Sequence, residues 1–189
     1  NGNVEWSHPL EGSADLLTIH KDSIIATSSV YDIEHGDFME SGIWRFSFSG
    51  NLLEHLSIDE KPWFIDGFDD LVVGLGRPRC GILIGDEHQD LKVSSPVTCG
   101  IRTPTSIFTG HVDGSIFELK KGIFANLDSP IHMLSFTTES LTSSDENGVL
   151  TSFDYNCKTI WEASGNQITT HAYGFEGYHW CGRFSEETS

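Results

Sequence analysis

The sequence predicts an all-β protein assembled from a repeated unit of four short antiparallel strands. The clearest copy runs over Leu134–Trp161, where a tight turn at 145–148 precedes an apolar strand. Asn147-Gly148 supplies the positive φ angles that a two-residue hairpin requires. Five glycines, each expected to open the third strand of a unit, recur at spacings of 39, 33, 34 and 34 residues: Gly42, Gly81, Gly114, Gly148 and Gly182. Repetition at this period, with turn glycines before apolar runs, is typical of a β-propeller.

The repeat makes residues 1–189 a single propeller domain with about five recognisable four-stranded blades. Their expected bounds are 13–56, 62–93, 97–127, 130–162 and 167–189. Most expected strands are apolar over three or four consecutive residues, as in Leu71-Val72-Val73. Such runs are typical of strands that neighbouring layers cover on both faces.

The first blade is expected to take strands at 13–19, 22–28, 42–48 and 52–56. Between the second and third lies Ser29–Ser41, a loop far longer than its counterparts in the other blades. Extra residues in one loop of a rigid repeat often carry function, and a solvated insertion is the alternative. The loop contains Asp32, Glu34, His35 and Asp37, but no regular element fixes their spacing, so we predict no metal site.

The second blade is expected at 63–67, 70–75, 81–85 and 91–93, with a glycine-rich turn at Gly74–Gly81. This turn joins two strands, whereas a phosphate loop needs a helix behind it. Arg77 and Arg79 in the turn are two of only eleven basic residues. An exposed arginine pair suits a carboxylate or an acidic partner segment, and simple solubilising charge is the alternative.

The third blade is expected at 97–102, 105–109, 115–119 and 123–127, and the fourth is the clearest copy above. The fifth, at 168–172, 176–181 and 182–185, lacks a fourth strand. Residues 1–6 resemble the outer strand end at 156–161, so we expect a strand at 3–7 to close the last blade and remove an exposed edge. A five-bladed ring and a portion of a seven-bladed ring both fit this pattern.

The innermost strands predict a ring of side chains that face a central channel. Aligned to the start of each second strand, the ring holds Asp15, Trp63, Thr98, His132 and Thr169. Their neighbours along the strands are mainly apolar, so by the two-residue period of a strand the ring residues face the channel while the neighbours pack between blades.

Propeller topology also gathers a second set of residues on one face, around the channel mouth: Tyr31, Phe38, Arg77, Arg79, His111 and Asp145. We predict a binding site there; a water-filled channel lining is the alternative.

Composition narrows the functional classes. The net charge of −17 repels phosphate backbones, which argues against nucleic acid, and it favours a basic partner. The four cysteines form no C-x-x-C pair, and we expect no cofactor or catalytic motif. With no glycosylation sequon, signal peptide or membrane-length apolar run, the sequence predicts a cytoplasmic or otherwise intracellular protein.

The repeats resemble those of the WD-repeat superfamily in a degenerate form, with Phe153-Asp154 and Ile160-Trp161 closest to the Trp-Asp ends. Four segments also resemble the diphthine methylesterase family: Val4–Gly12, Val30-Tyr31, Gly42–Phe48 and Leu141–Leu150. The first resemblance implies a scaffold that binds a protein through its loop-rich face. The second implies a hydrolase of diphthamide biosynthesis acting on elongation factor two, with no catalytic residue transferable to this chain. We predict the scaffold, and the hydrolase is the alternative.

Overall fold

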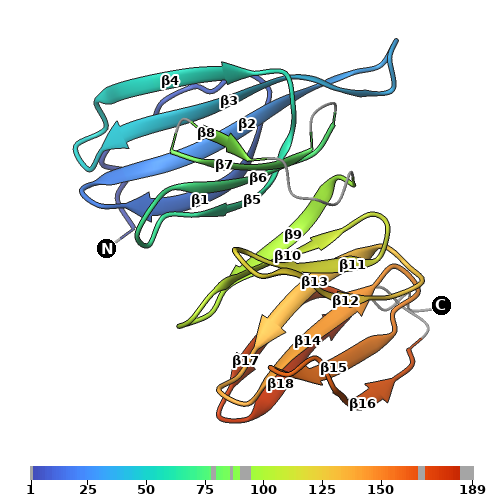
Figure 1. Cartoon of the computed structure of the whole chain (residues 1–189). Coiled ribbons are helices and arrows are strands. Elements are labelled where there is room, and N and C mark those ends of the chain that lie inside the picture. Colours follow the sequence, from blue (N-terminus) through green and yellow to red (C-terminus); the bar gives the residue numbers. More distant parts are fainter. Residues whose placement is uncertain (1, 78–79, 86, 90–94, 166–168, 184–189) are drawn as a thin grey trace, which may run out of the picture. The chain divides into compact units, whose positions relative to one another are not determined.

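The computed structural model describes the chain except residues 1, 78–79, 86, 90–94, 166–168 and 184–189. The described residues form only strands, which confirms the all-β prediction. Four sheets have four strands and one has two, and within each sheet consecutive strands pair antiparallel (Figure 1). The chain divides into two compact units, residues 1–90 and 91–189, which are described in turn.

The first unit holds two meandering sheets. The first sheet contains β1 (Ser13–His20), β2 (Ser23–Asp32), β3 (Asp37–Ser47) and β4 (Leu52–Ile58). The second contains β5 (Pro62–Asp66), β6 (Val72–Leu75), β7 (Gly81–Ile84) and β8 (Glu87–Gln89). A core joins the two sheets and consists of Ile25, Ile43, Ile58, Val73, Leu75 and Leu83. Consecutive residues of β6 and β7 are buried, and for this reason both strands are continuous apolar runs in the sequence. The expected fourth strand at 91–93 lies outside the described residues, and β8 takes the fourth place in the sheet.

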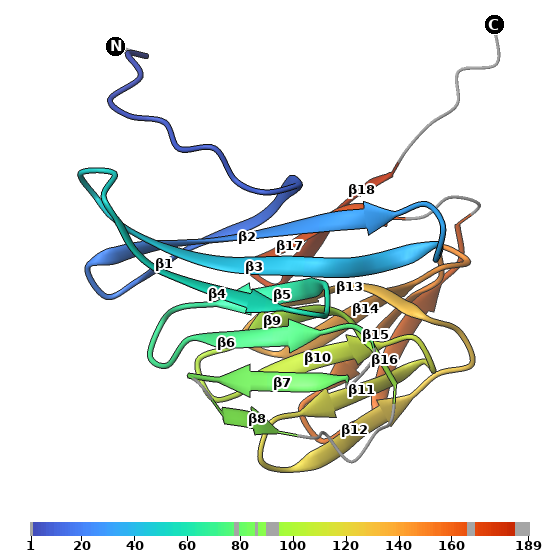
Figure 2. The same ribbon diagram turned by 90° about the horizontal axis from the view of Figure 1, so that it is seen from above.

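The second unit holds two further meanders and a hairpin (Figure 2). One meander contains β9 (Val97–Arg102), β10 (Ile107–His111), β11 (Ser115–Glu118) and β12 (Gly122–Asn126). The other contains β13 (Ile131–Phe136), β14 (Ser140–Asp145), β15 (Leu150–Asp154) and β16 (Thr159–Ala163). The hairpin contains β17 (Thr169–Phe175) and β18 (Tyr178–Arg183). The core between the meanders is built largely from Phe108, Phe124, Ile131, Leu141 and Phe153.

The prediction of a long loop at Ser29–Ser41 is wrong, because most of these residues belong to strands. The β2 strand continues to Asp32 and β3 begins at Asp37, so the pair forms a hairpin that projects beyond its sheet (Figure 1). The tip is held by Asp32 Oδ1, which accepts the N–H groups of Glu34 at 2.8 Å and His35 at 3.1 Å. Gly36 completes the turn at φ 67°. The insertion therefore lengthens a rigid ladder instead of forming a loose loop.

The fifth blade also departs from the expected strand boundaries. Glu176 (φ 47°) and Gly177 (φ 80°) form the turn of a single hairpin, where a second strand was expected to begin. Gly182, expected to open a third strand, lies inside β18 opposite His171. Gly182 was chosen because it lies 34 residues after Gly148, which continues the spacing of the repeat. The turn itself lies at 176–177, where two adjacent residues have the positive φ angles of a primed hairpin turn. Residues 184–185 of the expected strand lie outside the described residues.

The N-terminal segment lies differently from the expected closing strand. Residues 2–10 form no strand, and the Trp6 indole donates a hydrogen bond to the Phe48 carbonyl at 3.0 Å. Its ring centroid lies 5.7 Å from that of Phe46, and Leu10 packs beside the same apolar group on the face of the first sheet. This placement follows from burial, because an apolar sheet face offers an indole more contact than a strand edge does. Among the described residues, no helix is long and apolar enough to cross a membrane.

Candidate functional site

Bulges mark the strand position that the sequence assigned to a channel lining. In the first strand of each sheet the register skips a residue, and bulges of this kind redirect side chains. The residues outside the regular pairing are Asp15 with Leu16, Trp63, Thr98, His132 and Thr170. Four of the five ring residues thus lie at the bulges. The fifth bulge is one residue further on, and Thr169 is instead buried against Ser144, whose hydroxyl donates to it at 2.8 Å.

Within the first unit, one lysine gathers several of the predicted residues. Lys61 precedes β5, and its Nζ lies 3.3 Å from Asp15 Oδ1. The same ammonium lies 3.9 Å from the centroid of the Phe38 ring and 4.5 Å from that of Trp63. We call Lys61 and the residues packed around it the Lys61 cluster: Asp15, Tyr31, Asp37, Phe38, Lys61, Trp63 and Arg77. A cation over two ring faces and beside a carboxylate is held by three attractive contacts.

The ion pair at the centre of the Lys61 cluster is largely removed from water. The side chains of Lys61 and Asp15 are each only 14% exposed. The Ser29 hydroxyl donates to the second carboxylate oxygen of Asp15 at 2.5 Å, so both of its oxygens are engaged. Losing one partner of such a pair leaves an uncompensated charge and is destabilising. This arrangement therefore fixes β1, β2 and the start of β5 against one another.

Three aromatic rings form an edge-to-face row over this ion pair. Tyr31 on β2 meets Phe38 on β3 with ring centroids 5.2 Å apart, and Phe38 meets Trp63 on β5 at 6.2 Å. The inner ring, Phe38, is partly buried, while Tyr31 is 53% and Trp63 43% exposed. Aromatic pairs prefer these perpendicular arrangements. The row therefore presents two large aromatic surfaces to solvent on a rigid base.

The turn after β6 joins the cluster through Gly76 and Arg77. The Gly76 amide donates to the Lys61 carbonyl at 3.0 Å, and a Cβ at Gly76 would lie 2.9 Å from Trp63 Nε1. Arg77, 65% exposed, pairs with Asp37 at 2.8 Å. The carboxylate partner expected for Arg77 is thus supplied by this chain. Arg79 lies outside the described residues.

Lys61 itself was missed by the sequence reasoning. It stands two residues before Trp63, in a chain with only eleven basic residues, and this scarcity was the available signal. Its neighbour Glu60 is fully buried, and one carboxylate oxygen accepts the Cys80 amide at 3.2 Å. Glu60 therefore holds the turn after β6, while the Lys61 side chain contacts β1 and β3.

The predicted residues of the second unit have structural partners. His111 is fully buried, with Nδ1 3.0 Å from the Ser95 carbonyl and Nε2 2.9 Å from the Thr109 hydroxyl. Burial holds the pKa of His111 below its ordinary value. The neutral ring then donates from Nδ1 and accepts at Nε2. Asp145 is also buried, and its Oδ1 accepts the amides of Asn147 and Val149, which shapes the β14–β15 turn.

The remaining predicted residue of this unit, His132, is exposed at its bulge. Among the described residues, no hydrogen bond, ion pair or ring contact joins His132 to His111 or Asp145. Asp15, Tyr31, Phe38, Trp63 and Arg77 come together in the first unit, and the other described members, His111, His132 and Asp145, belong to the second unit. The shared face across both units stays a prediction.

A hydroxyl–imidazole contact elsewhere in the second unit has the residue types of nucleophilic catalysis. The Ser135 hydroxyl lies 2.7 Å from His179 Nδ1, and Ser140 lies 2.9 Å from Nε2. Burial lowers the pKa of His179. Ser135, however, is fully buried, so a substrate carbonyl has no access to its oxygen. The contact therefore secures β18 to β13 and β14.

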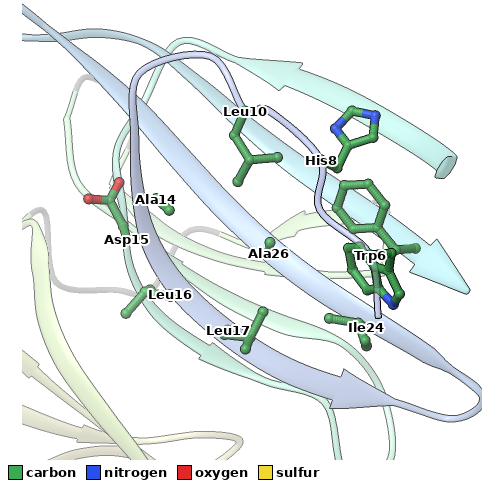
Figure 3. A pocket seen from close by; sticks show the side chains of 10 residues that line it. Trp6, His8, Leu10, Ala14, Asp15, Leu16, Leu17, Ile24 and Ala26 are labelled. Atoms are coloured by element: carbon green, nitrogen blue, oxygen red, sulfur yellow. The ribbon is translucent and has the colours of Figure 1, made fainter. Parts of the chain in front are cut away.

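A groove of about 350 Å³ lies between the N-terminal segment and β1 (Figure 3). Trp6, His8 and Leu10 form one wall, and Ile24 and Ala26 of β2 form part of the floor. Asp15 also lines the groove, but its carboxylate is engaged by Lys61 and Ser29. The walls are otherwise almost entirely apolar, so the groove has few groups with which to orient a ligand.

No family model and no curated protein matches this sequence. The WD-repeat and diphthine methylesterase resemblances therefore gain no support from a sequence match. Solved structures do match.

BamB from Moraxella catarrhalis superposes with a TM-score of 0.69 at 13% identity, covering 95% of this chain and 58% of BamB. The AfRom2 CNH domain gives 0.61 at 12% identity, with 91% of this chain and 64% of that domain covered. BBS1N, crystallised in complex with ARL6DN, also gives 0.61 at 12% identity, covering 88% of this chain and 60% of BBS1N.

The chain thus spans about three fifths of each of these three proteins. Identities this low establish a shared architecture and leave activity open. The likeness agrees with the repeated four-stranded meanders of the described residues. The fold of this chain is that of a β-propeller.

Proposed function

We propose that this protein is a propeller scaffold that binds another protein through the Lys61 cluster and the neighbouring tip of the β2–β3 hairpin. The observation that carries the proposal is the exposed aromatic row, in which Tyr31 and Trp63 flank Phe38 beside Arg77. Tyrosine and tryptophan are among the residue types that dominate binding energy at protein interfaces. Because these side chains are exposed side by side, we interpret them as a surface that contacts a partner protein.

The rigidity of the cluster supports the same proposal. Phe38 and Trp63 are fixed by the Lys61 ammonium, and Trp63 also rests on Gly76. Side chains that are ordered before binding lose less conformational entropy when a partner docks. The hairpin adds exposed apolar surface at Ile33 and Met39. A preformed aromatic surface with an apolar margin therefore suits a protein partner.

One similar structure shows that a propeller of this kind can engage a protein. BBS1N was solved in complex with ARL6DN. That contact belongs to BBS1N, and it supports only the general use of such a fold as a docking platform. The hydrolase alternative has no comparable support in the described residues, since both serines that contact His179, Ser135 and Ser140, are buried.

The proposal is tested by quantitative affinity capture from an extract of the source cells with three baits. These are the wild-type protein, the double variant Tyr31→Ala with Trp63→Ala, and Lys158→Glu, which changes an exposed residue after the β15 turn. We expect a set of proteins that wild type and Lys158→Glu retain equally and that the double variant loses. If the double variant retains the same set, the binding surface lies elsewhere.

A further inference from the structure

The charge of the first unit is the starting point for identifying the partner. Residues 1–90 contain seventeen acidic and five basic residues, a net charge of −12, against −5 for residues 91–189 with eleven and six. The field around the first unit therefore attracts cations and repels anions over roughly a Debye length, about 8–10 Å at physiological salt.

The β2–β3 hairpin concentrates this charge beside the aromatic row. Between Ser29 and Ser41 there are four carboxylates and no lysine or arginine. Glu34 and Glu40 are exposed. The amide of His35 donates to the Asp32 carboxylate and keeps its pKa below the ordinary value.

Both described cations of the Lys61 cluster are already engaged within the chain. Lys61 pairs with Asp15, and Arg77 pairs with Asp37. An acidic partner would have to displace one of these internal carboxylates before it met a positive charge. The remaining carboxylates on this surface are the exposed Glu34 and Glu40, together with Asp32, whose Oδ2 lies 3.0 Å from His35 Nδ1. Complementarity therefore favours a positively charged partner.

The exposed rings point to the same chemistry. The face of an aromatic ring carries negative electrostatic potential, and the cluster already uses this property to hold Lys61. Tyr31 and Trp63 leave 53% and 43% of their surface open. Lysine or arginine side chains can stack there, while apolar neighbours in the partner cover Ile33 and Met39, which are also exposed.

From these observations, and resting on the proposed function above, we infer that the partner segment at this surface is basic: a stretch of lysine or arginine interspersed with large apolar residues. Its cations lie against the open rings of Tyr31 and Trp63 and face the hairpin carboxylates. Its apolar side chains cover the hairpin tip. The acidic partner that an unpaired arginine pair would favour is the competing interpretation, and Arg77 distinguishes the two.

The test uses two fluorescein-labelled peptides of equal length, one with alternating lysine and leucine and one with glutamate in place of lysine. Binding is followed by fluorescence anisotropy at about 50 mM and about 500 mM salt, where the screening of exposed charges differs strongly. We expect the basic peptide to bind at least about tenfold more tightly than the acidic one at low salt. Tighter binding of the acidic peptide would overturn the inference.

Four variants locate the binding surface. Glu34→Gln with Glu40→Gln should weaken binding of the basic peptide at least about fivefold, and Tyr31→Ala should weaken it about threefold. The matched control, Glu146→Gln with Glu162→Gln, removes the same charge from exposed positions of the second unit and should change binding less than about twofold. Arg77→Gln should leave binding unchanged or tighten it.

Two outcomes would overturn the inference at this stage. Equal losses for the two glutamine pairs would mean attraction by net charge alone. A loss with Arg77→Gln would mean that the arginine contacts the ligand. Failure of the proposed function has a different signature: the captured proteins of the preceding experiment would be indifferent to Tyr31→Ala with Trp63→Ala. If capture depends on those rings while the basic peptide shows no preference, the scaffold stands and the basic partner does not.

Discussion

The Lys61 ammonium contacts one carboxylate and two aromatic rings, which come from β1, β3 and β5. An exposed ion pair between a lysine and a carboxylate contributes little to stability, because both charges remain solvated. Here both side chains are mostly buried, so each charge depends on the other for compensation. Lys61 thus links the stability of the first unit to the geometry of its aromatic surface.

Replacing Lys61 with methionine preserves most of the side-chain volume and removes the charge. We expect Lys61→Met to lower the free energy of unfolding by about 2 kcal/mol, because the Asp15 carboxylate is left buried without its cation. Urea unfolding measures the change. Lys158→Met, at an exposed position, is the control and should cost less than about 0.5 kcal/mol. Equal effects of the two substitutions would show that the central ion pair is unimportant.

The buried imidazole of His111 predicts a pH dependence of stability in the second unit. Burial depresses the pKa of His111 in the folded state, so between that value and the ordinary one near 6.5 the unfolded chain binds the additional proton. Stability is therefore retained above about pH 6.5 and falls as the pH drops below it. The measurement is the slope of the unfolding free energy between about pH 7 and pH 5.5.

The variant His111→Gln should reduce that slope, since glutamine does not titrate. His179, whose pKa burial also lowers, contributes in the same direction, so some slope remains in the single variant. His132→Gln, at an exposed position of the same unit, is the control. An unchanged slope in His111→Gln would contradict the assignment of the pH dependence to this buried ring.

At the scale of elements, neighbouring meanders approach closely where a glycine leaves room. Gly67, in the turn after β5, would place a Cβ 2.3 Å from the Ile19 carbonyl oxygen of β1, and His20 Nδ1 lies 2.9 Å from the Gly67 oxygen. Gly174 of β17 approaches the Phe136 backbone of β13 in the same way. These contacts fix the distance between consecutive sheets within each unit.

A single methyl group tests this close approach. We expect Gly67→Ala to destabilise the first unit by about 2–3 kcal/mol, because backbone atoms cannot move aside as a flexible side chain would. The melting temperature and urea midpoint report the change. Gly2→Ala is the control, since a Cβ there meets nothing within 4 Å. A Gly67→Ala variant as stable as this control would mean that the two sheets are not packed as described.

At the scale of the whole molecule, the features predictable from the sequence were those set by local turn chemistry and strand period. Gly114 and Gly148 lie in turns with positive φ angles, and Gly81 opens β7 at φ 105°, whereas Asn147, expected at positive φ beside Gly148, does not adopt it. The strand period picked out Asp15, Trp63 and His132, which lie at bulges that the sequence did not predict, and their place in a channel lining stays a prediction. Both signals act over a few residues, and a repeat reinforces them.

The features that were missed depend on contacts between distant segments. Nothing local distinguishes a long loop from the extended β2–β3 hairpin until the ladder partner of Val30, which is Glu40, is known. The position of Trp6 was missed for the same reason: its indole packs on a sheet face formed by residues distant in the sequence, and not along a strand edge. In the sequence, Lys61 has the appearance of an ordinary surface lysine, because Asp15 and Phe38 lie 46 and 23 residues away and Trp63 lies on the strand that follows.

The central claim, that the Lys61 cluster and the hairpin tip form the partner-binding surface, is tested most directly by calorimetric titration of the captured partner. We predict that Tyr31→Ala with Trp63→Ala weakens binding at least about 30-fold, equivalent to about 2 kcal/mol, while circular dichroism shows an intact fold. Lys158→Glu should leave the affinity within about twofold of wild type. A Lys158→Glu variant that binds as weakly as the double variant, or more weakly, would place the interface near Lys158 in the second unit and contradict the account.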